Sequence, residues 1–372
     1  MRRSTAWIGG SVIAASTVLA AIHVIARVPA HRPEPLSGSR SASRLRWSPG
    51  ARTFALQRAA LWHPAIAEAG RASLVNVDHA VATPLVCRFR AEGLGGTTPK
   101  FECVTQAGDP IKVKYTGAEP HGEVAASRLL RAIGFAADEV TFVERVRCHG
   151  CPAFPFFTMK VLGLIDAPEV YGRWVDYAEY RDIAWAAVER RHPGIEIETA
   201  DGRGWAWFEL DRLDAPAAHI DALRLLAIFL VHWDNKAENQ RLVCLDHEAS
   251  ALRRERCGKP LALVQDLGAT FGPRKVNLRE WRHTPVWTDR ASCLVSMADL
   301  PHGGGTFAPV HISEAGRRFL AVRLGSLARA VIRTLFESAR FPQHDGEDVD
   351  AWVDAFQDKV REISAGPPCP AR

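Results

Sequence analysis

The chain reads His-Trp-Asp-Asn-Lys-Ala-Glu-Asn over residues 232–239. An apolar segment at 223–231 precedes this stretch and is long enough to end a buried helix. A second apolar segment at 261–264 leads, after one glutamine, into Asp-Leu-Gly at 266–268. The pattern predicts a polar loop after a core helix, followed by a strand that ends in an acid, an apolar residue and a glycine.

These polar side chains match the needs of phosphoryl transfer to a hydroxyl group. In such a reaction one carboxylate orients the hydroxyl, a carboxamide and a second carboxylate hold magnesium, and a lysine offsets charge on the migrating phosphate. The order resembles the protein-kinase superfamily, whose catalytic loop reads H-x-D-x-K-x-x-N and whose metal motif reads D-F-G. The resemblance implies that Asp234 is the catalytic base and Lys236 the phosphate contact, with Asn239 and Asp266 as metal ligands.

The chain departs from this family at three points. Trp233 stands where the family has arginine, and Leu267 stands where it has phenylalanine. Both changes leave the chemistry intact, but they argue against activation-loop control through that arginine. The interval between Asn239 and Asp266 is longer than is usual in the family, and its excess at 245–259 is polar and charged. We expect that excess to form an inserted surface loop.

Two alternating strands flank a glycine-rich turn between residues 85 and 104, which is typical of a β-hairpin. The turn contains Gly93, Gly95 and Gly96, and glycines let backbone amides approach a phosphate. By resemblance this is the nucleotide-covering loop, although it matches the family's G-x-G-x-x-G only in part. A plain tight turn is the alternative.

The same hairpin predicts a disulfide between Cys87 and Cys103. Opposed residues of an antiparallel hairpin have position numbers with a constant sum, and a turn centred on Gly95 places the two cysteines opposite each other. That register also produces two sensible pairs, Phe89 with Phe101 and Arg88 with Glu102. Disulfides persist in oxidising compartments, so this prediction favours export.

Four more cysteines stand in two pairs that are close in the sequence. Cys244 and Cys257 bracket the inserted loop and form the second expected disulfide. Cys148 and Cys151 enclose a histidine, but no second cysteine pair stands at zinc-site spacing. A disulfide or two unpaired thiols is therefore the favoured interpretation of that pair.

A strand at 111–115 and a helix at 120–134 follow the hairpin, since a proline opens the second segment and a glycine closes it. The resemblance implies a strand lysine on the α- and β-phosphates, held by a helix glutamate. Lys114 and Glu123 are the candidates for these roles. Lys112 is the rival of Lys114, because it points the same way along the strand. Glu119 is the rival of Glu123.

The resemblance extends over about residues 85–340 and implies an α+β, bilobal, protein-kinase-like fold with a small β-rich N-lobe and a helical C-lobe. A hairpin is expected from a strand at 140–146 and another at 153–161, the second running into the hinge between the lobes, with adenine bound near 161–163. Helices are expected at 313–324, 326–340 and 347–363 from their apolar spacing. The expected divisions are 1–30 signal peptide or membrane anchor, 31–50 flexible linker, 51–163 N-lobe, 164–363 C-lobe and 364–372 tail.

The N-terminus carries two arginines before an apolar stretch at 6–26, and Val-Pro-Ala at 28–30 fits a cleavage site. The stretch is long for a signal peptide and near the length of a membrane helix, so both interpretations stay open. The arginines that follow it outnumber those before it, which would favour a cytoplasmic domain. The net charge of +5 over 372 residues is too small to suggest a nucleic-acid partner.

Together these features predict an ATP- and Mg²⁺-dependent kinase, with Mn²⁺ as an alternative metal, that transfers the γ-phosphate to a protein or sugar hydroxyl. A small-molecule phosphotransferase of the aminoglycoside or choline-kinase type is a second hypothesis, although Lys236 favours the protein-kinase style. A pseudokinase that only binds a partner is the third, and the retained Asp234, Asn239 and Asp266 argue against it. The expected location is exported or membrane-anchored, with the domain outside the cytoplasm and membrane contact only through the N-terminal segment.

Overall fold

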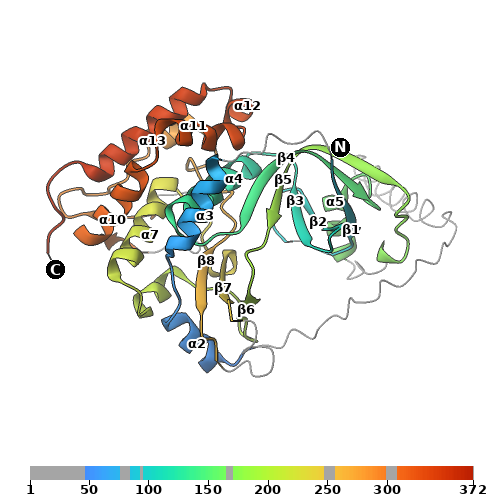
Figure 1. Ribbon diagram of the computed structural model, residues 1–372, viewed down its shortest axis with the longest axis horizontal. Coiled ribbons are helices and arrows are strands. Elements are labelled where there is room, and N and C mark those ends of the chain that lie inside the picture. Colours follow the sequence, from blue (N-terminus) through green and yellow to red (C-terminus); the bar gives the residue numbers. More distant parts are fainter. Residues whose placement is uncertain are drawn as a thin grey trace, which may run out of the picture.

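The computed structural model describes residues 47–75, 84–92, 95–164, 171–246, 256–298 and 308–371. Within these ranges the chain is a mixed α+β structure, with a β-barrel towards one end and most of the helices towards the other (Figure 1). The expected signal or anchor at 1–30, most of the expected linker and Gly93 lie outside the described residues. None of the described helices is long and apolar enough to cross a membrane.

Five strands close into the barrel in the order β1-β2-β3-β5-β4. Closure comes from the parallel pairing of β1 with β4. Alternate side chains of each strand point into the barrel, and these inward-facing side chains are apolar. The strands are β1 (Leu85–Arg90), β2 (Lys100–Thr105), β3 (Pro110–Lys114), β4 (Glu139–His149) and β5 (Tyr180–Arg190).

The β1–β2 hairpin forms as expected, but its predicted register is wrong by two residues. Cys103 lies opposite Phe89, not opposite Cys87, and the predicted pair of Arg88 with Glu102 is absent. The reason is that the pairing is centred on residue 96 instead of 95. A shift of two residues keeps every side chain on its original face. The disulfide between Cys87 and Cys103 is therefore confirmed, as a bridge between diagonal neighbours whose Cα atoms are 5.7 Å apart.

Helix α4 (Glu119–Ile133) matches the expected helix and is buried along most of its length. It ends at Gly134, which has φ 97°. A side chain at this position would also collide with the Trp62 ring, because a Cβ would lie 2.2 Å from Nε1. Trp62 in turn donates to the carbonyl of Ile133 at 2.7 Å. Helix α3 (Pro64–Val75) packs along α4 so closely that Gly70 leaves no room for a Cβ against the α4 backbone.

The prediction of a strand at 153–161 is wrong, because these residues lie largely in helix α5 (Pro155–Leu164). A disulfide between Cys148 and Cys151 turns the chain at the end of β4, and Pro155 then opens the helix. The partner of β4 is β5 instead, and β5 is the strand that leads out of the barrel. Residues 161–163, where the hinge was expected, therefore lie in α5, and a boundary at 163 would separate β5 from the other strands of its barrel.

A three-stranded sheet in the order β6-β7-β8 connects the barrel to the helical part. Its strands are β6 (Ile195–Glu196), β7 (Gln240–Cys244) and β8 (Pro260–Val264). The expected disulfide between Cys244 and Cys257 is confirmed and closes the loop between β7 and β8. Helix α2 (Pro49–Gln57) follows Trp47, whose backbone N–H donates to the carbonyl of Glu198 just after β6.

The helical part packs around an aromatic core that includes Phe229, Phe271, Trp281, Phe336 and Trp352. The three helices expected near the C-terminus are confirmed as α10 (Glu314–Gly325), α11 (Arg329–Ser338) and α13 (Val349–Ser364). A disulfide between Cys293 and Cys369, not expected from the sequence, fastens the C-terminal tail. The remaining elements are η1 (Trp207–Arg212), α7 (Ala217–Leu230), η2 (Ala237–Asn239), α9 (Leu278–His283), β9 (Leu294–Val295), β10 (Val310–His311) and α12 (Phe341–Asp345).

Candidate active site

A cavity of about 550 Å³ opens where the barrel meets the β6-β7-β8 sheet. It collects residues that are far apart in the sequence, from the glycine turn, β3, the loop after α7 and the end of β8. Glu123 lies directly behind this wall, in contact with the lysine that lines it. The predicted site residues that line the cavity are Gly95, Gly96, Lys114, Asp234, Lys236, Asn239 and Asp266.

The loop after α7 is held in shape by its own polar groups. Val231 adopts a left-handed conformation with φ 57° and ends the helix. Asn235 is fully buried and donates to the carbonyl of His232 at 2.9 Å. The Asn239 amide donates to the carbonyl of Asp234 at 2.8 Å. These two bonds fix the backbone on both sides of Asp234, whose side chain lines the cavity.

Lys114 lies at the centre of the charged groups in the cavity wall. Its side chain is only 2% exposed, and its Nζ is 2.6 Å from the Glu123 carboxylate and 3.3 Å from Asp266 Oδ1. Glu189 adds a third carboxylate at 3.8 Å. Burial alone would lower the pKa of Lys114, but the three carboxylates outweigh it and hold that pKa well above its usual value. Lys114 is therefore a fixed positive charge.

The two rival residues from the sequence have other partners. Lys112 Nζ lies 2.6 Å from Glu189, opposite it across the β3–β5 pair. Glu119, at the start of α4, lies 2.6 Å from Lys275 Nζ. The pair that joins β3 to α4 is thus Lys114 with Glu123.

Glu189 was not predicted from the sequence. Burial raises its pKa, but the charges of Lys112 and Lys114 outweigh burial and hold that pKa at about 2. Gln265 Nε2 also donates to it at 3.4 Å. The one signal in the sequence is an acid at the end of an apolar strand, and its partner lysines are identified only by the pairing of β3 with β5.

Asp266 follows β8 in a left-handed conformation with φ 54°. Such a conformation is uncommon outside glycine and concentrates at functional sites. The preceding residue, Gln265, donates its backbone N–H to the carbonyl of Asn239 at 3.1 Å, which joins the end of β8 to the loop after α7. Burial raises the pKa of Asp266, but Lys114, Lys100 and Lys112 hold it well below its usual range. Asp266 is therefore ionised, and its side chain remains 35% exposed.

The glycine turn closes the cavity from the barrel side. Gly96 has φ +83°, and a Cβ there would lie 3.1 Å from Lys100 Nζ, so any other residue would be strained. Gly95 has open space around its Cα. Lys100, directly after this turn, lines the same cavity.

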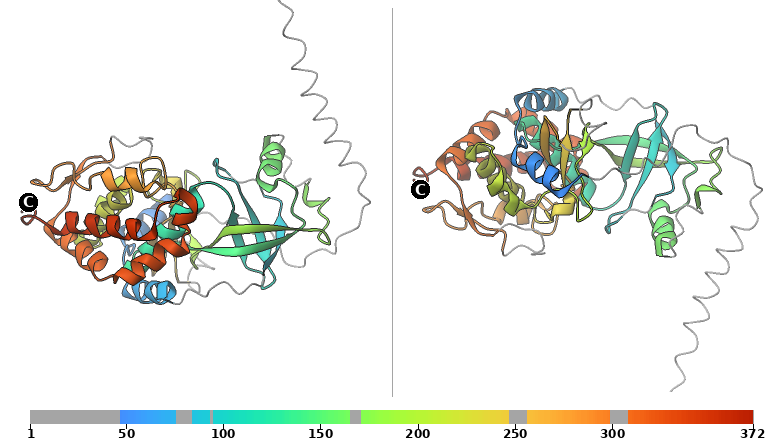
Figure 2. Two further views of the ribbon diagram at one scale, coloured as in Figure 1. Left: turned by 90° about the horizontal axis from the view of Figure 1, so that it is seen from above. Right: turned by 90° about the horizontal axis from the view of Figure 1, so that it is seen from below.

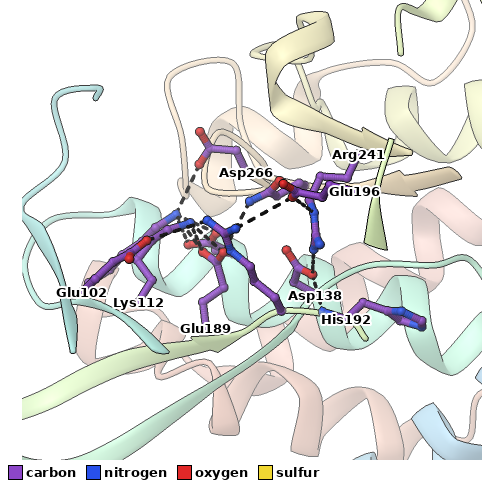
Figure 3. A network of polar contacts seen from close by, with 12 residues as sticks. Glu102, Lys112, Asp138, Glu189, His192, Glu196, Arg241 and Asp266 are labelled. Carbon is purple, nitrogen blue, oxygen red and sulfur yellow. Dashed lines mark hydrogen bonds and ion pairs between the residues drawn. The ribbon is translucent and has the colours of Figure 1, made fainter. Parts of the chain in front are cut away.

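A chain of ion pairs forms the wall between β5 and the three-stranded sheet (Figure 3). Arg191 bridges Glu102 of the barrel and Glu196 of β6, at 3.7 and 3.8 Å. Arg241 of β7 lies 2.6 Å from both Glu196 and Asp138. These contacts connect the barrel to the sheet through side chains, and no pattern in the sequence predicted them.

Two side chains at the edge of this cavity offer oxygen donors of the kind that Mg²⁺ binds. In the described ranges no three His, Cys, Asp or Glu side chains gather closely enough to hold a metal by themselves. Mg²⁺ commonly takes only one or two carboxylates from a protein and completes its shell with phosphate oxygens and water. Asp266 supplies an ionised carboxylate, and Asn239, whose amide nitrogen is engaged with Asp234, leaves its carboxamide oxygen for a cation.

Comparisons with known proteins add little to this geometry. No family model matches the chain, and no curated protein matches it significantly. Among solved structures it is similar to the Helicobacter pylori proinflammatory kinase CtkA, at 8% identity and a TM-score of 0.32. That alignment covers 77% of this chain and 100% of the other. A similarity this low shows neither the fold nor the function of the chain.

Proposed function

We propose that this chain is an ATP- and divalent-metal-dependent phosphotransferase with a bilobal, kinase-like architecture. The barrel would be the small lobe, and the helical part the large one. The observation that carries the proposal is Lys114, buried and bonded to Glu123, in the same cavity as Asp234, Asn239 and Asp266. Residues from four separate segments meet there, and they carry the groups that phosphoryl transfer uses.

Lys114 would contact the α- and β-phosphates of the nucleotide. Its high pKa supports this role, because the lysine keeps its charge as the phosphates arrive. Glu123 would hold the Lys114 side chain in place from α4. Gly95 and Gly96 would cover the phosphates with their backbone N–H groups, together with Gly93.

Asn239 and Asp266 would hold Mg²⁺, or Mn²⁺ in its place. When bound, the metal offsets negative charge on the phosphate oxygens. Asp266 needs no proton release to bind it, because its carboxylate is already ionised.

Asp234 would orient the acceptor hydroxyl and take its proton on a carboxylate oxygen. Lys236 Nζ lies 3.5 Å from Asp234 Oδ1 at present and is half exposed, so it is free to turn to the transferred phosphate. The buried Asn235 and the Asn239–Asp234 bond would keep the base in position during the reaction.

The proposed acceptor is a hydroxyl on a protein or a sugar. The proposed location of the domain is outside the cytoplasm, and the pairing of all eight cysteines in four disulfides is consistent with it.

The test is incubation of the full chain with γ-labelled ATP and Mg²⁺ or Mn²⁺, scoring autophosphorylation and transfer to protein, sugar and small-molecule acceptors. We expect the wild type to transfer the labelled phosphate and the Asp234→Asn variant to lose this activity. Transfer confined to small molecules would replace the proposed acceptor class. Metal-dependent ATP binding without turnover would indicate a binding module, and absence of nucleotide binding would refute the proposal.

A further inference from the structure

Helix α5 presents an apolar stripe to solvent. Phe154, just before the helix, is 68% exposed, and Phe157, Val161 and Leu164 are 56%, 61% and 85% exposed. Their spacing of three, four and three residues places them on one side of the helix. Figure 2 shows α5 standing out from the barrel, remote from the helical part.

The opposite side of α5 is firmly attached. Phe156 and Met159 are buried, and Met159 and Leu162 belong to the apolar cluster of the barrel. The disulfide between Cys148 and Cys151 restrains the chain just before the helix. The stripe is therefore a fixed feature of a packed helix.

The stripe is narrow, because it follows one side of a short helix. At roughly 200 Å² for a whole apolar side chain of this size, the exposed fractions correspond to about 500 Å² of apolar surface. Shallow insertion into the surface of a membrane would bury a narrow apolar stripe of this kind completely.

Two further features point to the same occupant. The apolar segment at 6–26 is near the length of a membrane helix, and in the uncleaved chain it would keep the domain close to a membrane surface. The surroundings of the stripe are interfacial in character: Lys160 is the one charged residue of α5, and Tyr180 is about half exposed next to the turn that leads into the helix.

We propose that α5 docks the barrel onto a phospholipid bilayer, with Phe154, Phe157, Val161 and Leu164 inserted among the lipids. The helix lies parallel to the surface, and Lys160 extends to the headgroups. This docking is independent of the proposed phosphotransferase activity, because none of these residues lines the cavity.

The experiment uses the full chain in liposomes of phosphatidylcholine with a minor fraction of phosphatidylglycerol, doped with a phospholipid that carries a photoreactive diazirine in its acyl chain. After irradiation, mass spectrometry maps the labelled residues. We expect label at 154–164 in the wild type and about tenfold less in the double variant Phe157→Ser, Val161→Ser. Both positions are exposed, so the fold is retained, as circular dichroism and intact disulfides would verify.

Val322→Ser provides the matched control, because Val322 is 67% exposed on α10 and lies outside the stripe. This variant should be labelled at 154–164 like the wild type. Absence of label at 154–164 in the wild type, equal label in the double variant, or equal label on α10 would each overturn the proposal. A crosslink between copies of the chain through 154–164, in place of lipid label, would show that a second copy covers the stripe and would overturn it too.

Discussion

Replacing Lys114 by methionine tests the charged centre of the cavity most directly. The side chains of Lys114 and Glu123 are 2% and 3% exposed, so the change leaves Glu123 buried without its lysine. Removing one partner of a buried ion pair typically costs about 3–5 kcal/mol of stability. Asp266 also loses its nearest positive charge, whereas Glu189 keeps Lys112 at 2.6 Å. We therefore expect Lys114→Met to lower the free energy of unfolding by about 4 kcal/mol.

A second variant separates the ion pair from simple loss of packing. In Lys114→Met, Glu123→Met both charges are replaced by apolar side chains, an exchange that is often close to neutral for a buried pair. The double variant should thus recover most of the stability that the single variant loses. The assay is urea unfolding with disulfides intact, followed by tryptophan fluorescence and analysed as a double-mutant cycle. A single variant within about 1 kcal/mol of the wild type, or a double variant whose loss equals the sum of the two single losses, would refute the reasoning.

Three further predictions concern the reaction, and a fourth concerns the pH dependence of stability. Asp234→Asn should keep ATP affinity and slow transfer by roughly two to four orders of magnitude, and a rate within a few-fold of the wild type would remove Asp234 from the mechanism. Asn239→Ala and Asp266→Ala should each abolish the Mg²⁺ dependence of ATP binding in calorimetry, and unchanged dependence in both would exclude them as ligands. Lys114→Met should weaken nucleotide binding more than Lys112→Met, and equal losses of affinity would mean that Lys114 does not have the special role assigned to it. Glu189 has a pKa of about 2 against an ordinary 4.5, so its stabilising effect is complete above pH 4.5 and disappears as the pH falls towards 2. Glu189→Gln should therefore lose less stability than the wild type between pH 4.5 and 2. An equal change of unfolding free energy with pH in both proteins would contradict this.

The local features of the chain follow from its sequence alone. The loop at 232–239, the strand and helix that carry Lys114 and Glu123, and the three C-terminal helices each depend on neighbours a few residues away. Apolar periodicity, a proline at a helix start and a glycine at its end act over that short range. The disulfide between Cys87 and Cys103 belongs here as well, because a two-residue error of register leaves both cysteines on the same face.

Tertiary structure decided the features that depend on distant pairing. Residues 155–164 are apolar enough for a strand, but β5 pairs with β4 along its whole length and leaves them outside the sheet, as a helix. Cys293 and Cys369 are 76 residues apart, and no local pattern brings them together. Glu189 and the series of ion pairs that runs from Glu102 to Asp138 acquire their partners only when the barrel closes against the three-stranded sheet. The physical reason is that a buried charge is tolerated only with its partner in place, and the partner's position is set by strand order and closure, which short stretches of sequence do not encode.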